Sequence, residues 1–249
     1  MRIAVLADIH ANDDALRAVL HDALRHGVSG FECLGDLVGY HAFPCETLDL
    51  LADHGVTSVS GNHDLMVLGR LAPTNCGPRA RAAIEFTQRH LSAAHLERLQ
   101  SLPTVRLGER WAFVHSAPDD PEIRLRTPQQ FRCAAAAVWR LRPEARICFT
   151  GHTHIPSMNE VVAKSEGGER RIRFINPGSV GDPRDGDARA SYAVFDTEHE
   201  TVKFRRVAYD ASRVIEAGVR EGLIDASLAA PRFGARALAL ARAIAETLT

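Results

Sequence analysis

The sequence predicts an α/β protein in which the first half of the chain forms a parallel β-sheet covered by helices. In that half, short apolar runs alternate with helical patterns in the order strand, helix, strand, helix, strand. This order is typical of a parallel sheet with helices packed on its faces. From residue 103 onward the pattern turns to strands, interrupted by one predicted helix at Pro128–Leu141.

The elements of the first half follow from local signals. The apolar run Arg2–Ala7 predicts a buried strand, and Asn12, Asp13 and Asp14 are N-cap candidates for a helix that stops near Gly27. The remaining elements expected here are strands at Phe31–Leu34 and Val56–Ser60, a helix at Cys45–His54, and mostly helix over 64–100 with a loop at Pro73–Pro78.

The second half is predicted to be rich in strands. They are expected at Val105–Leu107, Trp111–His115, Arg146–Thr150, Ser157–Val162, Arg171–Ile175, Ser191–Phe195 and Val202–Val207. Lys164–Glu169, which contains two adjacent glycines, is expected to form the tip of a hairpin. Helices are predicted again at Asp210–Glu221 and Ala235–Leu248.

No repeat, low-complexity tract or linker divides the sequence. We therefore expect one domain over residues 1–207 and a helical extension over 208–249 that packs on the same domain. The last helix has an apolar face that includes Leu238, Ala241 and Leu248, and such faces usually pack on their own domain. A contact between two copies of the chain is the alternative, so the sequence leaves open whether the protein is a monomer or a homo-oligomer.

Composition argues against several classes of protein. Of the 249 residues 45% are hydrophobic, and 30 Lys and Arg nearly balance 31 Asp and Glu, so no stable nucleic-acid binding is expected. The five cysteines are scattered without a C-x-x-C pair, which favours a reducing compartment over a disulfide framework. The sequence contains neither a secretory signal pattern nor the ~20 apolar residues of a membrane span. We therefore expect a cytoplasmic protein without membrane contact.

Polar residues that can bind a metal follow several predicted strands at the point where each strand ends. They are Asp8, His10, Asp36, Asn62, His63, His115, His152 and His154. In parallel α/β sheets the carboxyl ends of the strands form the crevice where ligands bind. The set contains carboxylate, amide and imidazole groups without a thiolate, which suits two divalent ions bound through nitrogen and oxygen. Gly35, Gly61 and Gly151 each precede such a residue, and glycine can take a positive φ and let the backbone approach a metal closely.

The ordered set Asp8-x-His10, Gly35-Asp36-x-x-Gly39, Gly61-Asn62-His63-Asp64, His115 and Gly151-His152-x-His154 resembles the motifs of the calcineurin-like metallophosphoesterase superfamily. The resemblance covers residues 1 to about 207. The stretch Asn176–Arg184 is similar to the small phosphodiesterase branch described as YfcE-like or diadenosine-tetraphosphatase-like. The helices after Tyr209 depart from the shortest members of that branch.

The resemblance implies a four-layer α/β/β/α sandwich of two mixed β-sheets flanked by helices. It also implies two divalent metal ions, one held by Asp8, His10, Asp36 and His154 and the other by Asp36, Asn62, His115 and His152. Asp36 would bridge both ions, since a carboxylate has two oxygens that can bind metal. Manganese is the expected metal, and iron, zinc or nickel suit the same ligands.

The implied reaction is hydrolysis of a phosphoester by in-line attack of a hydroxide that bridges the two ions. His63 is the expected general acid or electrostatic stabiliser of the leaving oxygen, and Asp64 is a candidate for orienting its imidazole.

Four further residues are candidates for substrate binding. Asn12 either supports the site or caps the first helix. Tyr40 and His41 lie in the loop after Asp36 and are expected to border the substrate pocket. Arg184 is expected either to clamp two phosphate oxygens or to pair with a nearby surface acid.

The motifs leave three functions open. The first is a phosphodiesterase acting on small phosphodiesters or nucleotides. The second is a phosphomonoesterase, which includes protein phosphatase and dinucleoside-polyphosphate hydrolase activity, and the shared metal ligands cannot separate these two. The third is a metal-binding scaffold without catalysis, against which the presence of His63 together with every ligand argues.

Overall fold

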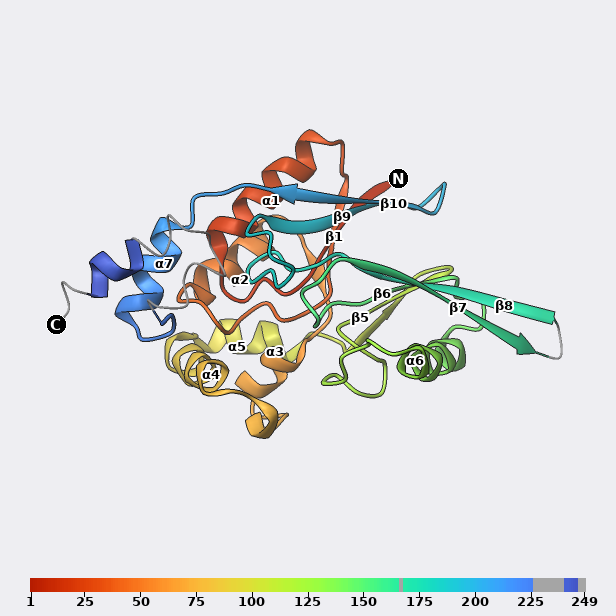
Figure 1. The fold of residues 1–249 in the computed structure, drawn as a ribbon, viewed down its shortest axis with the longest axis horizontal. Helices are drawn as coiled ribbons and strands as arrows, with labels where there is room; N and C mark the ends of the chain where they lie inside the picture. Colours follow the sequence, from red (N-terminus) through yellow and green to blue (C-terminus); the bar gives the residue numbers. More distant parts are fainter. Residues whose placement is uncertain (166–167, 226–239, 246–249) are drawn as a thin grey trace.

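Two five-stranded β-sheets lie face to face, and helices cover their outer faces (Figure 1). The computed structural model describes residues 1–165, 168–225 and 240–245. Side chains from both sheets meet in one buried apolar layer, which includes Val5 and Phe195 from the first sheet and Phe113 and Phe149 from the second. This architecture confirms the predicted four-layer sandwich of two mixed sheets.

The first sheet has the strand order β10-β9-β1-β2-β3. Its strands are β1 (Arg2–Leu6), β2 (Gly30–Cys33), β3 (Thr57–Ser58), β9 (Ala190–Asp196) and β10 (Thr201–Val207). β1, β2 and β3 are parallel, and β9 is antiparallel to both β1 and β10. Because side chains alternate along a strand, Ala4 and Leu6 pack with helix α1 (Asp13–Arg25), whereas Ile3 and Val5 face the second sheet.

The second sheet has the order β4-β5-β6-β8-β7. Its strands are β4 (Val105–Leu107), β5 (Trp111–Val114), β6 (Ile147–Phe149), β7 (Ser157–Ser165) and β8 (Gly168–Asn176). β5, β6 and β8 are parallel, so this sheet also has an edge at which several strands end together. Helix α6 (Pro128–Leu141) covers its outer face through Phe131, Ala135 and Val138.

The other helices connect the two sheets or follow them. They are α2 (Pro44–Asp53), α3 (Asn62–Val67), α4 (Pro78–His90), α5 (Ala93–Gln100) and α7 (Ser212–Arg220), with a short 3-10 turn at Pro73–Asn75. Three predicted strands differ in length from the observed ones by several residues. β3 has only two residues, because at Ser60 the chain already bonds to Pro103 outside the sheet. β7 and β8 are longer than predicted, because they pair as a hairpin from Ser157 with Asn176 to Ser165 with Gly168.

The described part of the C-terminal extension packs on the first half of the chain. Tyr209 accepts a hydrogen bond from Asn12, and Leu223 packs against Ala83 and Phe86 of α4. Of the helix predicted at Ala235–Leu248, residues 240–245 are helical and the rest lies outside the described residues. Within those described ranges no helix is long and apolar enough to cross a membrane.

Phe149 joins the two sheets, since its ring lies 5.2 Å from the ring of Phe113 and 5.0 Å from that of Phe195. The residue is fully buried. We expect Phe149→Ala to lower the free energy of unfolding by about 3–5 kcal/mol, because it leaves a cavity between the sheets. Urea denaturation measures this loss, and Phe204→Ala, at an exposed position on β10, should cost less than about 1 kcal/mol. Equal losses for both variants would contradict this account of the core.

Candidate metal centre

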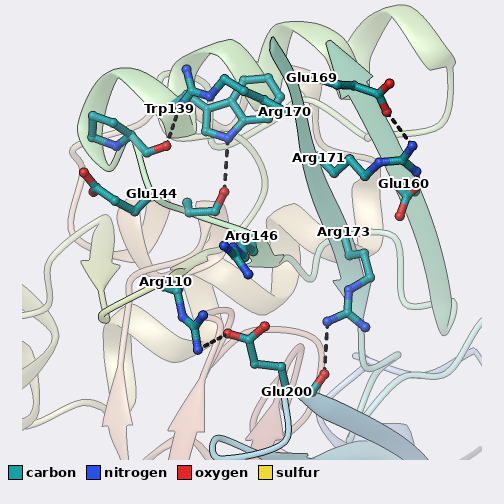
Figure 2. Close-up of a pocket in the computed structure, with 12 residues that line it drawn as sticks. Arg110, Trp139, Glu144, Arg146, Glu160, Glu169, Arg170, Arg171, Arg173 and Glu200 are labelled. Atoms are coloured by element: carbon teal, nitrogen blue, oxygen red, sulfur yellow. Dashed lines mark hydrogen bonds and ion pairs between the residues drawn. The ribbon is translucent and has the colours of Figure 1, made fainter. Parts of the chain in front are cut away.

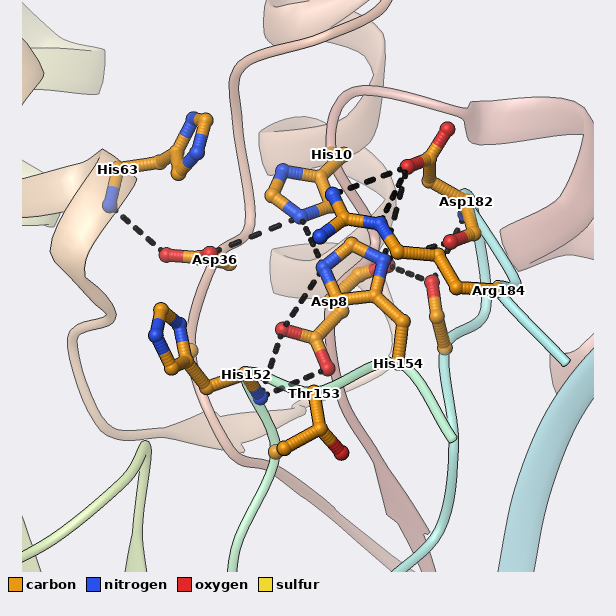
Figure 3. A network of polar contacts seen from close by, with 12 residues as sticks. Asp8, His10, Asp36, His63, His152, Thr153, His154, Asp182 and Arg184 are labelled. Carbon is orange, nitrogen blue, oxygen red and sulfur yellow. Dashed lines mark hydrogen bonds and ion pairs between the residues drawn. The ribbon is translucent and has the colours of Figure 1, made fainter. Parts of the chain in front are cut away.

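The polar residues singled out in the sequence come together where the strands of both sheets end. Asp8 and His10 follow β1, Asp36 follows β2, and Asn62 begins α3 just after β3. From the second sheet, His115 follows β5, and His152 and His154 follow β6. All seven side chains are buried, with at most 7% of any residue exposed. Figure 3 shows several of them converging from separate loops.

Four of these residues form a first group of donor atoms. His10 Nε2 lies 3.1 Å from His154 Nε2 and 3.6 Å from Asp36 Oδ2. Asp8 Oδ1 lies 3.7 Å from His154 Nε2. These are the four residues that the sequence assigned to one metal ion, and the structure brings them together.

A second group surrounds His115. His115 Nε2 lies 2.9 Å from Asn62 Oδ1, 3.2 Å from His152 Nδ1 and 3.4 Å from Asp36 Oδ2. Asp36 Oδ2 is thus close to both groups, whereas Asp36 Oδ1 accepts a hydrogen bond from the backbone N–H of His63 at 2.8 Å. The position of Asp36 is that of a bridging carboxylate.

Backbone carbonyls fix the orientation of all four imidazoles. Val38, Leu34, Glu122 and Asp182 supply the carbonyls that face His10 Nδ1, His115 Nδ1, His152 Nε2 and His154 Nδ1. A carbonyl only accepts, so each of these ring nitrogens carries the hydrogen and the opposite nitrogen presents a lone pair to its group. Two lone pairs 3.1 Å apart, as between His10 and His154, cannot hydrogen-bond to each other. The donor set therefore fits a cation between them.

Burial sets the electrostatics of the centre. It lowers the pKa of His115 to about 3 and raises the pKa of Asp8 to about 8. Burial, then the neighbouring His115 and Arg124, lower the pKa of His152 to about 3. The imidazoles are thus held neutral, which is the form that binds metal, and the carboxylates need a positive charge beside them to be ionised.

The backbone at the centre is strained. Asp8, His10, Asp36, His152 and His154 have φ between 52° and 65°, in the left-handed region that residues with a Cβ rarely adopt. Each such residue costs on the order of 1–3 kcal/mol and persists only where the surrounding structure enforces it. Five strained residues in one donor set indicate a functional site rather than a set of ordinary turns.

Glycine allows two of the ligand loops to touch. Gly35 has φ 89°, and a Cβ there would overlap the backbone of Gly61. A Cβ on Gly61 would in turn overlap the carboxylate of Asp36. Gly61 has φ −96°, and Gly151 does not have a positive φ either. The expectation of a positive φ at all three glycines is therefore correct only for Gly35. The other two serve close approach.

His63 lies beside the donor groups, with its ring centroid 4.7 Å from that of His10 and 4.6 Å from that of Tyr40. Its Nδ1 is buried, and among the described residues it has no hydrogen-bond partner. The expectation that Asp64 orients this imidazole is wrong. The Asp64 carboxylate instead accepts hydrogen bonds from the backbone N–H groups of Gly61, Leu37 and Val38. These bonds hold the loop after β2 against the loop after β3.

Asn12 and His41 lie behind the site. Asn12 caps α1 by accepting a hydrogen bond from Ala15 N–H at 3.1 Å, and its amide donates to the carbonyl of Gly181. His41 is fully buried, and its Nε2 lies 3.2 Å from the same carbonyl. Both side chains support the loop around Gly181. The capping alternative for Asn12 is confirmed, and neither residue is among those that line the cavity over the donor groups.

A cavity of about 520 Å³ opens over the donor groups, and Tyr40, His63 and Arg184 line it. The Arg184 guanidinium lies 3.2 Å from Asp182 Oδ2 and sits over the Tyr40 ring at 5.4 Å. Arg184 thus pairs with a nearby acid, as one alternative expected, and it also lines the cavity, whereas the phosphate clamp stays a prediction. Figure 3 shows Asp182 and Arg184 next to His10 and His154.

Three arginines in or near the cavity were missed in the sequence. Arg79 of α4 sits over the Tyr40 ring at 4.5 Å and lies 3.4 Å from Asp182 Oδ1. Arg124 and Arg126 line the cavity itself. No motif marks these arginines, although Arg124 and Arg126 alternate with apolar residues in a stretch that could have been interpreted as an extended segment with one buried face.

A second cavity, of about 640 Å³, lies at the amino ends of β5 and β6, away from the donor groups (Figure 2). Its charged side chains largely pair with one another. Arg110 pairs with Glu200, and Arg171 pairs with Glu160 and Glu169. The buried groups of metal-binding side chains lie at the first cavity.

A two-sheet sandwich with imidazoles and carboxylates at the shared strand ends defines a metallophosphoesterase fold. Residues 1–200 match the calcineurin-like phosphoesterase superfamily domain, and the chain belongs to that superfamily, as its motifs predicted. An uncharacterized protein of Methanocaldococcus jannaschii is 37% identical over 232 residues, which are 89% of this chain and 93% of the relative.

Two solved structures are similar over nearly the whole chain. The crystal structure of a metallophosphoesterase from Sphaerobacter thermophilus has a TM-score of 0.72 and 34% identity, and covers 98% of this chain and 99% of that one. A hypothetical protein from Pyrococcus horikoshii OT3 also has a TM-score of 0.72, with 22% identity, and covers 94% and 98%. At 22% identity, the similarity to the Pyrococcus horikoshii protein shows only that the two chains share a fold.

Asp36→Asn tests the assignment of the bridge. An amide lacks the negative charge that two cations share, so we expect the variant to lose at least one of two bound ions after loading with Mn²⁺. Elemental analysis of the dialysed protein measures this, with the exposed Asp119→Asn as the matched control. Two tightly held ions in Asp36→Asn would overturn the ligand assignment.

Proposed function

We propose that this protein is a phosphoesterase that depends on two divalent metal ions and hydrolyses small phosphodiesters or nucleotides. The observation that carries the proposal is the position of Asp36 Oδ2, which lies 3.6 Å from His10 Nε2 and 3.4 Å from His115 Nε2. One carboxylate oxygen between two groups of nitrogen donors is what a two-ion site requires. Membership of the phosphoesterase superfamily supports the same reaction class.

Two divalent ions in such a site activate water and stabilise negative charge on a phosphoryl group. Asp8, His10, Asp36 and His154 would hold one ion, and Asp36, Asn62, His115 and His152 the other. Mn²⁺ is our first choice, and Fe²⁺, Zn²⁺ and Ni²⁺ suit the same nitrogen and oxygen donors. The carbonyl contacts behind the imidazoles keep their lone pairs directed at the ions.

The other residues of the cavity would act on the substrate itself. His63 is proposed to donate a hydrogen bond to the leaving oxygen and so to stabilise the negative charge that develops on it. Burial, then the charge of Arg184, lower the pKa of His63 to about 3, so the free imidazole is neutral at pH 7 and is a hydrogen-bond donor. Arg184 is proposed to bind phosphate oxygens, for which its planar guanidinium is suited.

We also propose a cytoplasmic location, because all five cysteines are free thiols, as is usual in a reducing compartment. The substrate is proposed to be a small molecule, without stable binding of nucleic acid. The near balance of acidic and basic residues supports this.

Hydrolysis of chromogenic esters tests the function. After metal loading we expect turnover of bis-p-nitrophenyl phosphate, a diester, to exceed that of p-nitrophenyl phosphate, a monoester, with loss of activity in excess chelator. Preferred monoester hydrolysis would indicate a phosphomonoesterase instead. Absence of turnover of both esters by protein that holds two ions would overturn the proposal and favour a metal-binding scaffold.

His63→Ala tests the role of the imidazole. Because His63 lies outside the two assigned ligand sets, we expect both ions to remain bound while kcat falls by roughly 10²–10⁴-fold, the usual range for a positioned acid. The loss should be smaller for an ester with a good leaving group such as nitrophenolate than for an alkyl ester. The exposed His21→Ala is the control. Equal losses for good and poor leaving groups would exclude the leaving-group role.

A further inference from the structure

The segment Pro121–Thr127 forms one wall of the cavity over the metal centre. Its side chains alternate between two environments. Leu125 is buried in the apolar cluster under the second sheet, and Ile123 packs against that cluster. Glu122, Arg124 and Arg126 line the cavity instead. The alternation of an extended chain thus directs two guanidinium groups to the cavity and uses the apolar residues between them as anchors.

Both ends of this wall are fixed to neighbouring structure. At one end the carbonyl of Glu122 accepts a hydrogen bond from His152 Nε2 at 3.0 Å, which ties the segment to a candidate metal ligand. At the other end the backbone N–H groups of Arg126 and Thr127 donate to Gln130 Oε1, at 3.0 and 2.9 Å, within the N-terminal cap of α6. The two arginines therefore stand on a backbone that is held in place relative to the centre.

The arginines in and near the cavity differ in how they are paired. Arg79 and Arg184 both contact the carboxylate of Asp182. Within residues 1–165, 168–225 and 240–245, neither Arg124 nor Arg126 forms an ion pair. Glu122, the acid of the same segment, has its carboxylate 3.5 Å from the amide of Asn75. The two guanidinium groups of this wall are therefore available to bind an anion from outside the protein.

The charge of the metal centre indicates which anion the two arginines bind. Two divalent ions would exceed the charge of the two ligand carboxylates, Asp8 and Asp36, so the centre alone suffices to bind one phosphate group. A substrate with a single phosphate would leave Arg124 and Arg126 without a counter-charge. A second phosphate group would supply it, since guanidinium groups bind phosphate oxygens through paired, charge-assisted hydrogen bonds.

We propose that Arg124 and Arg126 form a second phosphate subsite, so that the substrate is a small molecule with at least two phosphate groups, one at the metal centre and one at this wall. The inference rests on the proposed function, because it places the first phosphate at the metal ions. The N-terminal end of α6 opens on the same cavity through Thr127 and Gln130, and its partial positive charge favours an anion there as well.

AMP and ADP, which differ by one phosphate, are the probes. Isothermal titration of the metal-loaded protein gives both dissociation constants without a measurement of turnover, and chromatography checks that the nucleotides stay intact. We expect the wild-type protein to bind ADP at least tenfold more tightly than AMP. In the double variant Arg124→Ala/Arg126→Ala this ratio should fall below about threefold, while the AMP constant changes by less than about threefold.

The control is the double variant Arg132→Ala/Arg140→Ala. It removes the same charge from exposed positions on the nearby helix α6, and it should keep the wild-type ratio. Thermal unfolding should show that both double variants remain folded. A wild-type ratio near one, or an unchanged ratio in the cavity variant, would overturn the subsite.

A proportional weakening of AMP and ADP would also overturn the subsite, because it indicates a general electrostatic attraction of anions. The two proposals can fail separately. Esters that are not hydrolysed by metal-loaded protein would overturn the phosphoesterase function, whereas the ratio of the two dissociation constants tests the wall whether or not any ester is turned over.

Discussion

The burial of Asp36 between two groups of imidazoles is the constraint on which the rest of the site depends. A carboxylate removed from water is costly unless positive charge or hydrogen bonds stabilise it. One of its oxygens accepts the backbone N–H of His63, and the other faces His10 and His115. Neutral imidazoles cannot supply the missing charge, so the interior of this protein is arranged for cations. The carbonyls behind the rings and the loops that carry them follow from that need.

The fold meets this constraint by ending strands of both sheets at one edge. β1 and β2 supply carboxylates and an imidazole from the first sheet, and β5 and β6 supply imidazoles from the second. The loops must turn sharply as soon as each strand ends, which places ligands such as Asp8 and His152 in the left-handed backbone region. Stacking of Phe149 between the two sheets contributes stability that offsets this strain, since large buried side chains are the main source of folding free energy.

The arginines in and near the cavity above the centre are held in two ways. Arg184, which lines the cavity, shares Asp182 with Arg79, and both guanidinium groups lie over the Tyr40 ring, so their charges are partly neutralised. Arg124 and Arg126 stand on an anchored segment that forms a second wall. Because unpaired guanidinium groups attract phosphate more strongly than paired ones, the second wall is the better place for an additional phosphate group. In the two proposals, the residues that would hold the ions and those that would select the substrate thus belong to separate parts of the chain.

The sequence by itself determined the fold class, through its periodicity and its resemblance to the superfamily, and the candidate metal ligands. Periodicity located the strands, and the carboxyl ends of parallel strands must meet at one edge, so Asp8, Asp36 and His115 could be placed together before any coordinates. Only the tertiary structure decided what lies near these residues through contacts between distant segments. It showed Asp64 bonded to backbone amides, Asn12 and His41 buried behind the site, and Arg124 in the cavity wall. Local patterns determine elements and their ends, whereas the direction of a loop side chain depends on packing against residues far away in the sequence.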